Sequence, residues 1–356
     1  MTARPLIVPY LGSAPAIGDA TFGPECALIG RVTLGEGAVL GRLVTLRGDG
    51  HDIDIGPNCR FLDRATVHIA DSIYPTHIGA RVTVGRFALV HACTVGDGCV
   101  IGDGAVVMDN STVGPGAVIA AGSLVPPGKQ LDGGVIYSGN PARPVREIGA
   151  DELEVLRRAL IEGTESDLPP LTMDPYRPTA ALGPLYEFAG AAPDIDPGCF
   201  VAPTSVVAGD VRAAEDVSLW FACAYRADGA PITVGPRSNV QDNSILLASA
   251  ATGPIVIGAD VTVGHNVRMG ACVVEDEALI GMGSEVGDGV VVERGAIVGA
   301  RALVLPGTVV KAGYIWAGRP AVEFRPVKPE EAAFFRRGTE VYVGYARNYL
   351  KQTRAA

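Results

Sequence analysis

Aliphatic residues recur at every sixth position in two long stretches of the chain. In the first half the period runs through Val95, Ile101, Val107, Val113, Ile119 and Val125. In the second half it runs through Val274, Ile280, Val286, Val292, Val298 and Val304. A period of six matches neither a helix nor a single strand. It is typical of a β-helix built from hexapeptide repeats, in which every sixth side chain points into a narrow prism.

The two halves of the chain align without a gap. Arg226 lies 179 positions after Arg47, and Asp288 lies 179 positions after Asp109 (226 − 47 = 179 and 288 − 109 = 179). We interpret this constant offset as a tandem duplication. Because hexapeptide repeats bury their core by stacking coil on coil, each half is predicted to form a solenoid of its own.

Two helical segments are predicted to follow the two prisms. We predict a first β-helix domain over residues 1–147, a short helix plus a Pro-rich linker over 148–184, a second β-helix domain over 185–327 and a C-terminal amphipathic helix over 328–356. The short helix is expected to have Asp151 as its N-cap and to stop at Gly163. The C-terminal helix is expected to pack one apolar face against a prism wall. That face carries Phe334, Val341, Tyr342, Tyr345 and Tyr349.

Charge and composition exclude several classes of partner. The formal net charge is −10, the isoelectric point is near 5.0, and no run of Lys or Arg interrupts this acidic balance, which argues against a nucleic-acid partner. None of the seven cysteines forms a CxxC pair, so we expect them to be reduced. No apolar segment reaches membrane-spanning length, and the N-terminal apolar run is too short for a signal peptide. We therefore expect a cytoplasmic protein without a membrane partner.

The positions of the histidines on the predicted coils point to a candidate site. Three steps along inward-pointing positions close one coil, so Val67 and Val90 are predicted to stack on one wall. His68 and His91, each one residue later, then share a side of the first prism. In the second half, Leu247 stands at the position of His68. Gly270 likewise stands at the position of His91.

The second half keeps the part of the constellation that the first half lacks. Gln241 and His265 share a side of the second prism, where the first prism has Leu62 and Arg86. Three neutral imidazoles and an open water position form a common catalytic zinc site. Here the imidazoles come from different prisms, so a complete site would need a side of a first half to face a side of a second half.

The sequence resembles the gamma-class carbonic anhydrases and their relatives over nearly the whole of both halves. The second half carries LWFACAYRAD at 219–228, NVQDNSILLA at 239–248, VTVGHNVRMGAC at 261–272, LIGMG at 279–283 and AGRPA at 317–321. The first half keeps LRGD at 46–49, Asp63, His68, His91 and SGNPA at 138–142. The resemblance implies two tandem left-handed parallel β-helix domains, an all-β solenoid, and a homotrimer formed through prism faces with zinc between neighbouring prisms.

The resemblance also implies roles for particular residues. In this family two histidines come from one prism and the third from its neighbour, which matches His68 and His91 on one side and His265 on the other. Gln241 matches the glutamine beside the zinc-bound water, and Asn239 and Asp242 match its polar supports. The pairs Arg47 with Asp49 and Arg226 with Asp228 match the family's ion pairs at the prism interface. Tyr137 and Trp316 stand where an aromatic residue can border the cleft, so Tyr137 is a further catalytic candidate.

Three hypotheses for function follow from the sequence. In the first, His68, His91 and His265 hold zinc, with iron or cobalt as other acceptable metals, and the bound water hydrates CO2 or hydrolyses a thioester or acyl substrate. In the second, the chain is a metal-free degenerate scaffold. In the third, it is a hexapeptide-repeat acyltransferase, for which only His51 or His77 could serve as the catalytic base. Each hypothesis predicts a homo-oligomer.

Overall fold

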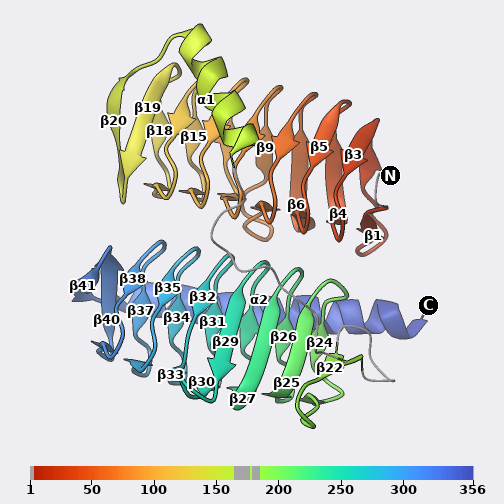
Figure 1. Cartoon of the computed structure of the whole chain (residues 1–356), viewed down its shortest axis with the longest axis vertical. Helices are drawn as coiled ribbons and strands as arrows, with labels where there is room; N and C mark the ends of the chain where they lie inside the picture. Colours follow the sequence, from red (N-terminus) through yellow and green to blue (C-terminus); the bar gives the residue numbers. More distant parts are fainter. Residues whose placement is uncertain (1–3, 164–176, 179–184, 356) are drawn as a thin grey trace. The chain divides into compact units, whose positions relative to one another are not determined.

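Each half of the chain forms its own β-helix. The computed structural model describes residues 4–163, 177–178 and 185–355, and it divides into two compact units, 1–169 and 170–356. In each unit the chain winds through three strands per coil, and strands of successive coils pair in parallel (Figure 1). The two β-helices are left-handed, and an α-helix follows each of them. The predicted fold class is therefore confirmed.

The first unit has three walls, which we number in chain order from the long strand β6 (Thr45–Ile55). β6 and the preceding β4 (Ala27–Leu34) run along walls one and two, and β1 (Leu6–Val8) and β2 (Ala16–Ile17) pair with β4. Wall one continues with β8 (Thr66–His68), β11 (Leu89–His91), β14 (Val106–Val107) and β17 (Leu124–Val125). Wall two continues with β9 (Thr76–Ile78), β12 (Thr94–Val95), β15 (Thr112–Val113) and β18 (Gln130–Leu131). Wall three holds β3 (Ala20–Phe22), β5 (Ala38–Leu40), β7 (Arg60–Phe61), β10 (Thr83–Val84), β13 (Val100–Ile101), β16 (Val118–Ile119), β19 (Val135–Gly139) and β20 (Ala142–Glu147).

The second unit repeats this arrangement around the long strands β25 (Val206–Ala213) and β27 (Ala224–Val234). β22 (Leu185–Glu187) and β23 (Asp194–Ile195) pair with β25, and β21 (Arg177–Pro178) pairs with β22. Wall one continues with β29 (Ile245–Ser249), β32 (Arg268–Met269), β35 (Glu285–Val286) and β38 (Leu303–Val304). Wall two continues with β30 (Ile255–Ile257), β33 (Cys272–Val274), β36 (Val290–Val292) and β39 (Val309–Val310). Wall three holds β24 (Phe200–Val201), β26 (Ser218–Leu219), β28 (Asn239–Val240), β31 (Thr262–Val263), β34 (Leu279–Ile280), β37 (Ile297–Val298), β40 (Tyr314–Gly318) and β41 (Ala321–Pro326).

The six-residue period marks the core of both prisms, as predicted. Every aliphatic residue that defines the period is buried, and each unit has one continuous hydrophobic cluster along its axis. The corners between strands are tight because successive coils nearly touch there. At Gly102, for example, a Cβ atom would lie 2.5 Å from the backbone nitrogen of Ala121, so no side chain fits.

Helix α1 (Ala150–Glu162) follows the first prism and is anchored by arginines. Arg157 donates hydrogen bonds to the carbonyl oxygens of Arg81 at 2.7 Å and Gly98 at 2.6 Å. The helix stops at Gly163, as predicted, but Asp151 is not its N-cap. The cap is Gly149, which offers no side chain to the helix, because Ala150 already has helical backbone. Asp151 lies in the first turn, where its charge still complements the helix dipole.

Helix α2 (Pro329–Ala355) follows the second prism and packs on its wall three. Tyr349 is buried and stacks on Phe200 with ring centroids 4.9 Å apart, and Trp220 meets Tyr342 edge-on at 5.3 Å. The predicted apolar face is thus confirmed at its tyrosines. Phe334 is an exception, since it is 60% exposed and Phe335 faces the prism in its place.

The cysteines and the helices add two further observations. All seven cysteines are free and buried, and burial raises the pKa of the Cys26 and Cys59 thiols to about 11. These thiols are therefore protonated at neutral pH, as expected of inert core residues.

Within the described residues, no helix has the length and apolar character needed to cross a bilayer. The predicted linker over 168–184 lies outside the described residues except for Arg177 and Pro178.

Candidate metal centre

Wall one of the first unit brings two histidines together. His68 on β8 and His91 on β11 are direct neighbours in the strand register, as the coil spacing predicted. His68 Nδ1 lies 3.3 Å from His91 Nε2, and both side chains are nearly fully buried. Both imidazoles follow an inward-pointing valine, so consecutive coils place them one above the other.

A carboxylate holds the far nitrogen of each ring. Asp49 Oδ1 lies 3.3 Å from His68 Nε2, and Asp109 Oδ1 lies 2.6 Å from His91 Nδ1. When each ring donates its N–H to its carboxylate, the two nitrogens that face each other both carry lone pairs. Two lone pairs at 3.3 Å repel each other unless a cation, either a proton or a metal ion, lies between them. The arrangement therefore suits a bridging cation.

Asp49 is itself held by a buried arginine. Arg47 Nη1 donates to Asp49 Oδ2 at 2.6 Å, and neither side chain is exposed. Arg47 is also the register neighbour of His68. The guanidinium thus holds one oxygen of Asp49, while the other faces the imidazole of His68. The corresponding pair of the second unit, Arg226 and Asp228, joins at 2.7 Å but is partly exposed.

The one histidine of the second unit at the candidate site also lies beside a carboxylate. His265 lies in the turn after β31, and its Nδ1 is 3.1 Å from Asp242 Oδ2, with both side chains fully buried. The other oxygen of Asp242 accepts the backbone N–H of Phe221 at 3.0 Å, which fixes the carboxylate. His265 Nε2 is thereby directed away from Asp242, and the hydroxyl of Tyr342 on α2 lies 3.5 Å from it.

Gln241 lies beside His265 on the second prism, as predicted. Its Nε2 donates to Asn239 Oδ1 at 3.1 Å, and Asn239 Nδ2 donates to Thr262 Oγ1 at 2.9 Å. Gln241 Oε1 is buried and has no hydrogen-bond partner among the described residues. A buried acceptor without a donor is costly. This oxygen is therefore suited to accept a hydrogen bond from a bound molecule.

In the second unit, other residues stand at the positions of the two histidines of the first unit. Leu247, at the position of His68, is partly exposed. At Gly270, the position of His91, a Cβ atom would lie 2.2 Å from Asp288 Oδ1. The side chain of Asp288 accepts the backbone N–H of Ala271 at 2.8 Å and occupies the place that a Cβ atom at residue 270 would take. Wall one of the second unit therefore presents neither histidine.

Other residues predicted from the sequence lie elsewhere. Tyr137 is on β19 of wall three, in the hydrophobic core, and its hydroxyl donates to the carbonyl of Asp132 at 3.3 Å. This position is on a different wall from the His68 and His91 pair. His77 lies half-exposed on wall two, 3.1 Å from Asp54. His51 contacts Asp52 on the surface.

The geometry of the histidine pair fits a tetrahedral metal ion. Two nitrogen ligands at about 2.0–2.1 Å from zinc lie about 3.3–3.4 Å apart in a tetrahedron. This agrees with the 3.3 Å between His68 Nδ1 and His91 Nε2. Carboxylates on the outer nitrogens are the usual second partners of zinc-bound histidines. Sequence reasoning did not assign Asp109 or Tyr342 to the neighbourhood of the histidines. The shared spacing of Asp109 and Asp288 was a signal for the former, whereas nothing in the sequence marks the latter.

The chain is similar to hexapeptide-repeat proteins and to carbonic anhydrases. Residues 92–127 match the bacterial transferase hexapeptide (six repeats) family. Gamma carbonic anhydrase 1, mitochondrial, of Arabidopsis thaliana is 40% identical over 166 residues, which are 45% of this chain and 60% of that protein. The carbonic anhydrase of Geobacillus kaustophilus (strain HTA426) is 40% identical over 174 residues, which are 48% of this chain and 95% of that protein.

Among solved structures, a hexapeptide transferase family protein from Anaplasma phagocytophilum is similar to one half of the chain. It is 36% identical, with a TM-score of 0.44, and the match covers 46% of this chain and 96% of that one. The alignment to the Arabidopsis relative spans only 60% of that relative's length.

Proposed function

The chain belongs to the family of gamma-class carbonic anhydrases and their hexapeptide-repeat relatives, and we propose that it is a zinc enzyme that activates water. The observation that carries the proposal is the pair of facing nitrogens of His68 and His91 at 3.3 Å, each ring held from behind by a carboxylate. This pair supplies two of the three protein ligands that a catalytic zinc takes.

We propose His265 as the third ligand. Its Nδ1 lies 3.1 Å from Asp242, so we take its Nε2 as the nitrogen that binds a metal. Neither half contains all three histidines, so the site is a hybrid of a first-half and a second-half prism. A homotrimer formed through prism faces, with the Arg47–Asp49 and Arg226–Asp228 pairs at its interfaces, is the assembly that we propose for this purpose.

A bound zinc ion would supply a hydroxide nucleophile at neutral pH, because it lowers the pKa of its water to about 7. Iron or cobalt would be accepted by the same imidazoles. The side chains of this chain have separate tasks. Asp49, Asp109 and Asp242 fix the ring tautomers, and Gln241 Oε1 accepts a hydrogen bond from the nucleophile and so orients it.

The proposed substrate is a small electrophile, either CO2 or an acyl thioester. Gamma carbonic anhydrase is the printed name of the Arabidopsis relatives, which supports hydration of CO2 as the first activity to measure. The second candidate is a metal-free scaffold. It is supported by the second half, where Leu247 and Gly270 stand in place of the two histidines. The ability of a single proton to bridge His68 and His91 also supports it. An acyltransferase has less support, since His51 and His77 are surface residues with aspartate partners.

Metal analysis separates these functions. The protein is purified without chelator, and its zinc, iron and cobalt contents are measured for the wild type and for His68→Ala, His91→Ala and His265→Ala. We expect tightly bound metal in the wild type and its loss in each variant, together with loss of CO2 hydration or thioester hydrolysis. His77→Ala is the matched control and should retain the metal. A wild-type metal content near zero that zinc supplementation does not change would overturn the proposal and favour the scaffold.

A further inference from the structure

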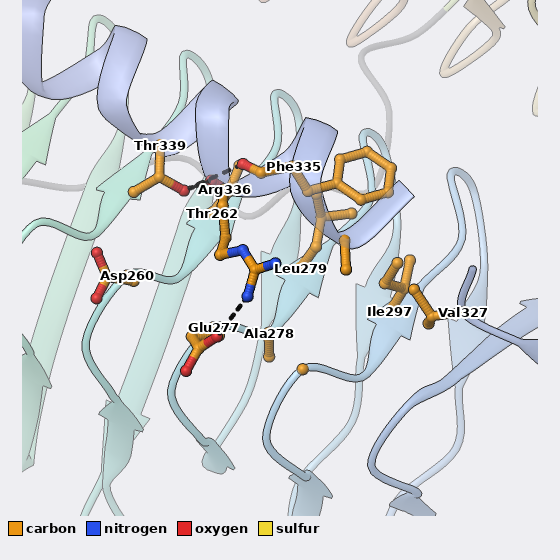
Figure 2. A pocket seen from close by; sticks show the side chains of 12 residues that line it. Asp260, Thr262, Glu277, Ala278, Leu279, Ile297, Val327, Phe335, Arg336 and Thr339 are labelled. Atoms are coloured by element: carbon orange, nitrogen blue, oxygen red, sulfur yellow. Dashed lines mark hydrogen bonds and ion pairs between the residues drawn. The ribbon is translucent and has the colours of Figure 1, made fainter. Parts of the chain in front are cut away.

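A hydrogen-bond chain links helix α2 to Gln241. Thr339 of α2 and Thr262 of β31 lie with their hydroxyl oxygens 3.3 Å apart (Figure 2). Thr262 Oγ1 accepts from Asn239, and Asn239 Oδ1 accepts from Gln241. The far end of the chain is the hydroxyl of Thr339, which donates to the carbonyl oxygen of Phe335 at 3.4 Å. Three side chains therefore connect the helix backbone to the glutamine of the site.

The donors and acceptors along this hydrogen-bond network follow one order. Thr339 donates its proton to the carbonyl oxygen of Phe335, and in that arrangement its Oγ1 accepts from Thr262. Thr262 has then used its one proton and must accept from the amide nitrogen of Asn239. Asn239 in turn presents its oxygen to Gln241, which must donate from Nε2. This order leaves Gln241 Oε1 without a donor among the described residues.

We propose that Thr262 and Thr339 are positioning residues that fix the amide of Gln241 with its oxygen, not its nitrogen, toward the bound molecule. This inference rests on the proposed function, and it adds the C-terminal helix to the site. Its consequence concerns ligand chemistry. A ligand atom next to Gln241 Oε1 must be an O–H or N–H donor, because two acceptors at that position would repel each other.

Several contacts fix helix α2 on the second prism, so it can anchor one end of this hydrogen-bond network. Its aromatic residues pack on Trp220 and Phe200, and Arg347 forms a bidentate pair with Asp216 at 2.9 and 2.6 Å. Tyr342 follows Thr339 by one turn and places its hydroxyl 3.5 Å from His265 Nε2. One helix face therefore meets both the glutamine network and the third histidine.

A small cavity lies beside the two threonines. It lies between α2 and wall three of the second unit, and Figure 2 shows Asp260, Glu277 and Arg336 at its polar side. Its volume of about 50 Å³ admits water. The cavity lets water approach Thr262 and Thr339, so removal of their hydroxyls exposes the network to exchange with solvent.

The first unit provides a matched contrast. Thr83 stands at the position of Thr262 (262 − 179 = 83), but Arg60 and Leu62 replace Asn239 and Gln241. There the threonine hydroxyl accepts from Arg157 of α1 at 2.8 Å and serves the helix alone. A substitution at Thr83 therefore removes a hydroxyl from the same strand position without touching an amide network.

The test reads the amide of Gln241 directly by NMR. The chain has three glutamines, Gln130, Gln241 and Gln352, so selective ¹⁵N-glutamine labelling gives three side-chain NH₂ pairs. The Gln241 pair is assigned by its disappearance in Gln241→Met. In Thr339→Val and in Thr262→Val we expect this pair to shift and its exchange with solvent to accelerate about fivefold or more, the factor that corresponds to about 1 kcal/mol of hydrogen bonding. Thr339→Ser keeps the hydroxyl, so the Gln241 NH₂ pair should keep its wild-type shift and exchange rate. Thr83→Val should also leave this pair unchanged.

The outcomes separate this inference from the proposed function. An unchanged Gln241 pair in both valine variants, with circular dichroism showing a folded protein, would overturn it. Should Thr339→Val unfold α2, Thr262→Val still decides, because this residue belongs to the β-helix. Metal content is measured on the same samples and should match the wild type in both variants. A wild type without metal defeats the zinc proposal but leaves the amide measurement intact.

Discussion

The guanidinium of Arg86 donates a hydrogen bond of 2.6 Å to the carbonyl oxygen of Gly163, the residue at which helix α1 ends. It also donates to the carbonyl of Leu160 at 2.9 Å. Arg86 stands at the position of His265 in the other half (265 − 86 = 179). The C-terminal end of a helix carries orphan carbonyls and partial negative charge, which favour a cation. The first prism thus uses this corner to dock its helix, not to hold a metal.

Replacing Arg86 should loosen α1 without affecting the metal. We expect Arg86→Met to lower the stability of the first unit by about 1.5–3 kcal/mol, the range for hydrogen bonds to a charged group, because Arg86 is nearly buried. The measurement is the midpoint of urea unfolding, with Arg158→Met on the exposed side of α1 as the control. Loss of bound metal in Arg86→Met would contradict the separation of the two roles.

The carboxylates behind the histidines should control metal affinity. Asp109→Asn and Asp242→Asn remove the charged acceptors of His91 and His265, so each should weaken zinc binding by about 10- to 100-fold. Affinity is measured by competition with a chromophoric chelator. Asp54→Asn removes the partner of His77 on the surface and should have no effect. Equal affinity in all three variants would mean that the carboxylates do not orient the ligands.

Tyr137 should behave as a core residue. Its hydroxyl makes a 3.3 Å hydrogen bond to the carbonyl of Asp132 within the hydrophobic cluster of the first prism. Tyr137→Phe should therefore cost about 1 kcal/mol in stability and leave metal content and turnover at the wild-type level. Turnover and thermal unfolding are measured on the same preparation. If turnover collapses in a folded variant, Tyr137 has the catalytic role that the sequence resemblance predicted.

The start of α2 should contribute a pH-dependent component of stability. Arg325, through a side-chain hydrogen bond, lowers the pKa of Glu331 from 4.5 to about 2. Because the folded-state pKa is depressed, this contribution is present above pH about 4.5 and is lost as the pH falls toward 2. Glu331→Gln should melt below the wild type at pH 6, and the gap should shrink at pH 3. A gap that is the same at both pH values would show that the pair does not act through ionisation.

The architecture was readable from the chain because a prism repeats locally. Every sixth residue faces the axis, so the spacing of Val67 and Val90 predicted the stacking of His68 on His91, and the strand register confirms it. The tyrosines of α2 were likewise placed by helical spacing. The sequence-based predictions were wrong where a single backbone conformation or one side-chain packing arrangement decides the local structure. Asp151 lost the cap to Gly149 because the helix begins two residues earlier than the sequence signal indicated.

The sequence by itself determined the two prisms and the division of the histidines between them, since both depend only on spacing along the chain. Tertiary structure alone decided which carboxylate holds each ring, how Asp288 fills the place of a histidine, and that Tyr342 and Thr339 reach across 77 residues to His265 and Thr262. These contacts depend on where a helix docks and which rotamer its neighbours leave open. Periodicity carries no information about either, because docking is set by the packing of side chains that are distant in sequence.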